Sequence, residues 1–202
     1  ASGNQSTVAG GQSNTASGYN SAVGGGVGNV ASGAQSTVSG GWNNCATGIN
    51  STVAGGRLNI ASSCSSFVGA GQNNTASGYM STIGGGFSNL TANQFSTIGG
   101  GYDNTVSGNQ GFVGGGQVNT ASGSFATVGG GQSNTASGTR GTIAGGESNL
   151  ATNNFSSVVG GQNNTASGVY SVAAGGYFTS LLGTTELWNG TSWTSNPTGL
   201  NT

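Results

Sequence analysis

The feature that most constrains this chain is a fifteen-residue period, which begins at Ala1 and runs to Ser180 without insertion or deletion. The first two periods read ASGNQSTVAGGQSNT and ASGYNSAVGGGVGNV, and ten more follow in the same frame. A strict repeat this short is the signature of a solenoid, in which each repeat forms one coil and stacks on the next. We number the positions of each repeat from 1 to 15.

Two positions of the repeat are consistently small or apolar. Position 8 is Val or Ile in every repeat except the last, which has Ala173, and position 1 is nearly always Ala. Short β-compatible segments surround both, over positions 6–8 and from position 14 round to position 2. Because successive side chains of a strand point to opposite sides, positions 8 and 1 face inward when positions 7, 9, 15 and 2 face outward.

The sequence therefore predicts an all-β fold, a β-solenoid of twelve fifteen-residue coils over residues 1–180, with two short strands in each coil. At about 4.8 Å per coil, the rod would be about 55–60 Å long. We expect the coil to be left-handed. A single stack with so thin a core should also associate laterally with other copies.

Glycine marks the corners of the predicted coil. At position 3 the few replacements include Asn93 and Asn153, which indicates a left-handed backbone there, because Asn tolerates positive φ. Position 11 accepts nothing but glycine, which indicates an extreme backbone conformation or a close backbone contact. These structural-turn residues are Gly11, Gly26, Gly41, Gly56, Gly71, Gly86, Gly101, Gly116, Gly131, Gly146, Gly161 and Gly176.

Position 14 is Asn in every repeat but the last, where Thr179 replaces it. Asn side chains stacked at the coil spacing can hydrogen-bond along the rod, so we expect a structural Asn ladder rather than an active site. Its members are Asn14, Asn29, Asn44, Asn59, Asn74, Asn89, Asn104, Asn119, Asn134, Asn149 and Asn164.

Positions 4, 5, 12 and 13 vary, and they are rich in aromatic residues. They flank the turns and should line the two long edges of the rod. Exposed aromatic residues suit a recognition surface, although the same residues could simply cover the turns or pack between chains. The candidate recognition residues are Tyr19, Trp42, Tyr79, Phe87, Phe95, Tyr102, Phe125, Phe155 and Tyr170.

The outward rows at positions 7 and 15 are mostly Thr, but they include larger apolar residues such as Phe67, Phe112 and Ile60. Apolar groups on an outward row favour burial against a neighbouring chain. Cys45 and Cys64 occupy different positions of the repeat, which favours two separate thiols over a disulfide framework.

Residues 181–202 abandon the repeat. Asn189-Gly190 is a two-residue turn signal, so this segment is typical of a hairpin. Because a solenoid end needs covering, we interpret it as a cap or as a joint to another module, with a sugar-binding role for the tryptophans as the alternative. The residues assigned to this cap or joint are Tyr177, Phe178, Leu181, Leu182, Trp188 and Trp193.

Catalytic chemistry is hard to build from this composition. The chain has no His, only 2% charged residues and a net charge of −1, so a Ser–His pair or a carboxylate pair is not expected. We expect no enzyme activity, no catalytic residues, no metal site and no cofactor. The charge gives no footprint for nucleic acid, and no apolar run is long enough for membrane insertion.

Blocks of the form ASGxxSTVxGGxxNT, with Ser6, Val8, Gly10, Ala16 and Gly18 in place, resemble the YadA-like head repeats of trimeric autotransporter adhesins. They are also similar to β-solenoid repeats of bacteriophage tail fibres. This resemblance covers residues 1–180 and implies an extracellular, homotrimeric, fibrous adhesin on a virion or a cell surface.

Three functions follow as hypotheses. The first is a glycine-rich structural rod of a phage tail fibre or a bacterial surface adhesin, which presents its edge residues to a receptor or glycan. The second is an extracellular filament whose subunits stack end to end through the tail. The third is an ice-binding β-solenoid, because flat Thr rows can order water.

Overall fold

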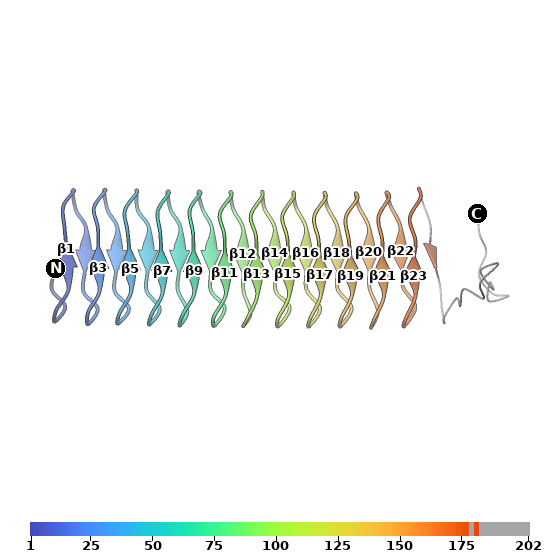
Figure 1. The fold of residues 1–202 in the computed structure, drawn as a ribbon, viewed down its shortest axis with the longest axis horizontal. Helices are drawn as coiled ribbons and strands as arrows, with labels where there is room; N and C mark the ends of the chain where they lie inside the picture. Colours follow the sequence, from blue (N-terminus) through green and yellow to red (C-terminus); the bar gives the residue numbers. More distant parts are fainter. Residues whose placement is uncertain (178–179, 182–202) are drawn as a thin grey trace.

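The computed structural model describes residues 1–177 and 180–181, and within these residues the secondary structure is entirely β. Successive coils stack in one direction and form an elongated rod that starts at the N-terminus (Figure 1). Each coil contributes two strands of two residues each, and the strands form two separate twelve-stranded sheets. The prediction of a β-solenoid with two short strands per coil is therefore confirmed.

The first sheet joins the odd-numbered strands, which occupy positions 7 and 8 of successive coils. These are β1 (Thr7–Val8), β3 (Ala22–Val23), β5 (Thr37–Val38), β7 (Thr52–Val53), β9 (Phe67–Val68), β11 (Thr82–Ile83), β13 (Thr97–Ile98), β15 (Phe112–Val113), β17 (Thr127–Val128), β19 (Thr142–Ile143), β21 (Ser157–Val158) and β23 (Val172–Ala173).

The second sheet joins the even-numbered strands, which occupy position 15 of one coil and position 1 of the next. These are β2 (Thr15–Ala16), β4 (Val30–Ala31), β6 (Cys45–Ala46), β8 (Ile60–Ala61), β10 (Thr75–Ala76), β12 (Leu90–Thr91), β14 (Thr105–Val106), β16 (Thr120–Ala121), β18 (Thr135–Ala136), β20 (Leu150–Ala151), β22 (Thr165–Ala166) and β24 (Ser180–Leu181).

All strand pairs are parallel, and each residue pairs with the residue fifteen positions away. Val8 pairs with Val23 in the first sheet, and Ala16 pairs with Ala31 in the second. A third column of single-residue bridges runs along position 12, from Gln12↔Val27 to Gln162↔Tyr177. The sequence does not reveal this column, because an isolated bridge leaves no alternation of apolar and polar residues. Each coil is thus tied to its neighbours at three places.

The core of the rod is one thin layer of small side chains. The Val or Ile residues at position 8 and the Ala residues at position 1 are 0–1% exposed, apart from the exposed Ala1 and the half-buried Val8 in the first coil. Ser at position 6 and Asn at position 14 are buried with them. Buried polar groups usually have hydrogen-bond partners, and Ser51 Oγ donates to the Gly48 carbonyl at 2.7 Å, whereas Ser21 Oγ and Ser36 Oγ in the same row have no partner among the described residues.

Position 11 needs glycine for two reasons. Its φ is positive in every coil, for example 88° at Gly116, where a residue with a Cβ would be strained. A Cβ at Gly116 would also overlap the carbonyl oxygen of Gly131 in the next coil. Conformation and close backbone contact thus act together, which explains why no other residue occurs there.

The left-handed conformation expected at position 3 is wrong. Gly18, for example, has no positive φ, but a Cβ there would overlap the carbonyl of Gly33 in the next coil. Close approach of the backbone is therefore the reason for glycine at this position. Asn93 and Asn153 replace it where the side chain is exposed and hydrogen-bonds to the Ser107 and Ser167 carbonyls.

The left-handed turns fall instead at positions 5 and 13, where the non-glycine φ values lie between 51° and 60°. At these residues the backbone N–H donates to the preceding coil, whereas the N–H of the first residue in a strand donates to the following coil. The N–H of Thr7 donates to the following coil, at Ser21, whereas the N–H of Asn20 donates back to the preceding coil, at Asn4. The backbone bond helps to offset the roughly 1–2 kcal/mol cost of a left-handed L-residue, so almost any side chain is accepted at these turns.

Candidate interaction edges and the asparagine ladder

The position-14 asparagines form a buried row that links side chains to backbone. The Nδ2 group of Asn119 donates to the Gly115 carbonyl at 3.0 Å and to the Gly131 carbonyl in the next coil at 2.8 Å. Its Oδ1 accepts the N–H of Asn134 at 3.0 Å. The same three bonds recur along the row, so each Asn closes its own turn and binds the next coil. This arrangement is structural, and it leaves no asparagine side chain of the row turned to solvent beyond the first coil.

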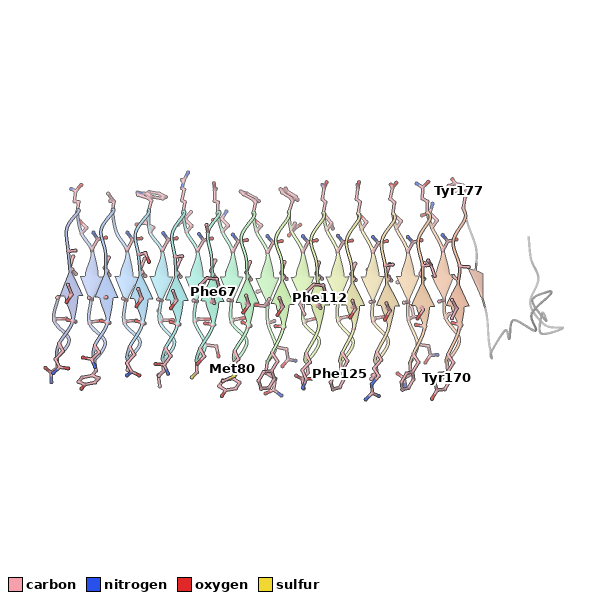
Figure 2. All side chains as sticks on the ribbon, in the orientation of Figure 1. Phe67, Met80, Phe112, Phe125, Tyr170 and Tyr177 are labelled. Carbon is pink, nitrogen blue, oxygen red and sulfur yellow. The ribbon has the colours of Figure 1, made fainter. Side chains whose placement is uncertain are left out.

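The variable positions project from two opposite edges of the rod. The 4/5 edge consists of positions 4 and 5 of each coil, and the 12/13 edge consists of positions 12 and 13. Figure 2 shows Met80, Phe125 and Tyr170 at the first edge and Tyr177 at the second. Of the candidate recognition residues, those on the 4/5 edge are Tyr19, Tyr79, Phe95, Phe125, Phe155 and Tyr170, and those on the 12/13 edge are Trp42, Phe87 and Tyr102.

All of these aromatic side chains are 36–58% exposed in the single chain. Since residues fifteen apart lie in adjacent coils, their rings meet along the rod. On the 4/5 edge, Phe155 and Tyr170 stack with ring centroids 4.7 Å apart, and Tyr79 contacts Phe95 edge to face at 5.6 Å. Apart from Tyr19 in the second coil, the aromatic residues of this edge lie from the sixth coil onward, between Tyr79 and Tyr170.

On the 12/13 edge the aromatic residues lie in the first seven coils, apart from Tyr177. The Arg57 guanidinium lies over the Trp42 ring at 4.3 Å, and Phe87 and Tyr102 stack at 5.4 Å with ring planes 5° apart. Gln117, Gln132, Glu147 and Gln162 follow at position 12, so the later part of this edge is polar up to Tyr177, except for the 40% exposed Val118, and Tyr177 itself is 65% exposed. The Tyr79–Phe95 and Phe87–Tyr102 pairs thus occupy the same two coils on opposite edges, whereas Trp42 lies nearer the N-terminus and Phe125, Phe155 and Tyr170 lie nearer the C-terminus.

The broad faces carry the outward rows at positions 7 and 15. Phe67 and Phe112 stand on the first sheet, 38% and 41% exposed, between the two edges in Figure 2. Ile60, on the second sheet, is 37% exposed. Cys45 and Cys64 are both free and half-buried, and burial raises the pKa of the Cys45 thiol.

Of the residues assigned to the cap, the structure describes Tyr177 and Leu181. The backbone of Leu181 pairs in strand β24, next to Ala166, and Tyr177 forms the last bridge of the position-12 column. Phe178, Leu182, Trp188 and Trp193 lie outside the described residues.

The titratable side chains of residues 1–177 are dispersed. Asp103 and Glu147 lie on the 12/13 edge three coils apart, about 14 Å along the rod, which is too far for the usual carboxylate pair of a glycosidase. No group of three or more His, Cys, Asp or Glu residues is gathered in the described part of the chain. Nor do these residues include a helix long and apolar enough to cross a membrane.

The segment of residues 6–18 matches the ubiquitous surface protein adhesin repeat. It contains both strands of the first coil, β1 and β2, and the position-11 glycine and position-14 asparagine between them. The match is shorter than one full repeat, but the same pattern recurs in the later coils, for example ATVGGGQSNTASG at residues 126–138. No curated protein has a sequence significantly similar to this chain. The chain thus combines a β-solenoid fold with a repeat that is similar to an adhesin repeat.

Proposed function

We propose that this chain is the rod of a fibrous adhesin, located outside the cell on a bacterial surface or on a phage tail fibre. The observation that carries the proposal is the unbroken fifteen-residue register, which builds a straight, evenly hydrogen-bonded rod whose most variable side chains lie along its edges. The match at residues 6–18 supports the same class of protein. The edges would present the aromatic residues to a receptor, and the rod itself would perform no chemistry.

The broad faces would pack against other copies of the chain, with three copies favoured. Phe67, Phe112 and Ile60 support this, because a rod with so little core exposes large apolar side chains in the outward rows, where most residues are Thr. Burying a Phe side chain contributes roughly 1.5–3 kcal/mol, so a few such residues on each copy could hold the rods together.

The test is the mass of the purified chain in solution, by light scattering after size exclusion and by sedimentation velocity. A discrete trimer is expected, and replacement of Phe67 and Phe112 by Ser should weaken it, whereas Gln72→Ser on the 12/13 edge should not. A monomer at all concentrations would overturn the proposal. Open-ended polymers would instead support the filament in which subunits join end to end.

A further inference from the structure

Arg140 is held between two aromatic rings on the 4/5 edge. Its Cζ lies 5.1 Å from the ring centroid of Phe125 in the preceding coil and 5.2 Å from that of Phe155 in the following coil. Tyr170 extends the stack by one more coil. All four residues occupy position 5 with φ between 56° and 60°, so the same turn geometry presents each side chain.

The charge of this side chain is not neutralised by the described part of the rod. Arg57 and Arg140 are the only basic residues in the sequence. Of the acidic residues, Asp103 and Glu147 lie on the opposite edge, so neither can pair with Arg140. The N–H donors of a guanidinium form a fork in the plane of the group, and an arginine with aromatic rings beside it can still offer them to a ligand. That planar fork matches a carboxylate, which can accept two parallel hydrogen bonds from it.

The backbone next to the stack is already used. The N–H groups of Arg140, Phe155 and Tyr170 donate to the carbonyls of Ser124, Thr139 and Asn154, at 2.8, 2.9 and 3.0 Å. A peptide ligand therefore cannot add a strand to this turn, because strand addition needs free backbone groups. Recognition here must rely on side chains.

The residues that precede Phe125, Arg140 and Phe155 in the chain are short and polar. Ser124, Thr139 and Asn154 occupy position 4 and offer hydroxyl and amide groups on the same edge, whereas Val169, before Tyr170, is apolar and 42% exposed. Three features of this segment each match one feature of an acidic sugar. The aromatic rings suit the apolar face of a sugar ring, the small polar groups suit its hydroxyls, and the arginine suits its carboxylate. A pyranose ring of a linear polysaccharide also advances by a distance similar to the coil spacing, so a chain lying along the edge could contact successive coils.

From this arrangement we infer that the edge segment Phe125–Arg140–Phe155–Tyr170 binds an acidic polysaccharide, with the carboxylate of a uronic-acid sugar on Arg140 and neighbouring sugars against the rings. The inference rests on the proposed adhesin function and names the class of ligand at one part of its edge. Arg57 provides the matched comparison, since it lies on the other edge against a single ring, that of Trp42.

The experiment measures binding of a galacturonic-acid oligosaccharide to the full chain by calorimetry and by saturation-transfer NMR, with a neutral galactose oligosaccharide of the same length beside it. We expect binding of the acidic sugar only. Arg140→Gln should weaken it by about tenfold or more, because a charge-assisted bidentate pair is lost. Arg140→Lys should recover only part of the affinity, and Arg57→Gln should bind as the unaltered chain does. Unchanged thermal melting of each variant would show that the rod remains folded.

Three binding results would each overturn the inference: no binding of the acidic oligosaccharide by the unaltered chain, equal losses in Arg140→Gln and Arg57→Gln, or stronger binding of a poly-glutamate peptide than of the sugar. The last would indicate an acidic protein partner. The proposed function is tested separately by the trimer mass and by adhesion of the chain to cells. Adhesion that Arg140→Gln leaves intact would refute the polysaccharide site and leave the adhesin rod standing.

Discussion

Truncation of Asn119 to Ala in the middle of the rod tests the asparagine ladder. The change removes the side-chain bonds to the Gly115 and Gly131 carbonyls and the oxygen that accepts from both the N–H and the Nδ2 of Asn134, although this Nδ2 keeps its bonds to two other carbonyls. The Gly131 carbonyl keeps a second donor, the Gln117 N–H at 2.9 Å. Two groups are therefore left without their partner, the half-buried Gly115 carbonyl and the buried Asn134 N–H.

An unsatisfied buried donor or acceptor costs about 1–3 kcal/mol. Because water can partly reach Gly115, we expect the free energy of unfolding to fall by about 2–4 kcal/mol in total. The cost should also be local, since each coil of a solenoid contacts only its neighbours. Exchange of the backbone amides around residues 115–135 should accelerate more than exchange in the distant coils.

The assay is urea unfolding at one fixed chain concentration, combined with hydrogen exchange followed by mass spectrometry. Gln117→Ala is the matched control, because it removes an amide side chain from the same coil at an exposed position. It should change stability by less than about 0.5 kcal/mol. If Asn119→Ala is no less stable than this control, the ladder does not hold the coils together.

Other predictions concern the turns, a thiol and water. Gly116→Ala should lower the free energy of unfolding by about 2–4 kcal/mol, since it combines positive φ with a backbone clash, whereas Gly115→Ala, with no atom closer than 3.9 Å to its Cβ, should be nearly neutral. In a Cys64→Ser background, burial raises the pKa of Cys45, so its alkylation should rise at a higher pH in the native chain than in urea, and identical pH profiles would contradict this. Purified chain should show no thermal hysteresis, because apolar residues such as Leu90 interrupt the Thr rows; a measurable freezing gap would restore the ice-binding hypothesis.

Much of the fold follows from the period alone. The inward rows at positions 8 and 1 are predictable because they are almost invariant, and a parallel in-register stack then places every residue beside the one fifteen positions away. The turn conformations are harder to predict from the sequence. Phe125 and Arg140 give no hint of positive φ, since neither residue type favours it, and the conformation is imposed by hydrogen bonds to the preceding coil.

The same contrast holds for the edges. That aromatic residues line them is visible in the sequence, because positions 4, 5, 12 and 13 vary more than the inward and glycine positions and carry most of the aromatic residues. That Arg140 lies between two rings depends on the side-chain directions at position 5, which the sequence pattern does not define. The glycines of position 3 illustrate a further limit, because a close backbone contact and a left-handed turn select the same residue.

The in-register pairing of residue i with residue i+15 also bears on how such a rod could change through recombination. An exchange between two repeats adds or removes whole coils, and every new neighbour still meets its partner in the same register. Loss of residues 131–145, for instance, would shorten the rod by about 4.8 Å and preserve its ladders. It would also delete Arg140 and bring Phe125 next to Phe155. One such deletion would therefore change both the length of the rod and the charge of its 4/5 edge, while the remaining core residues would keep their register.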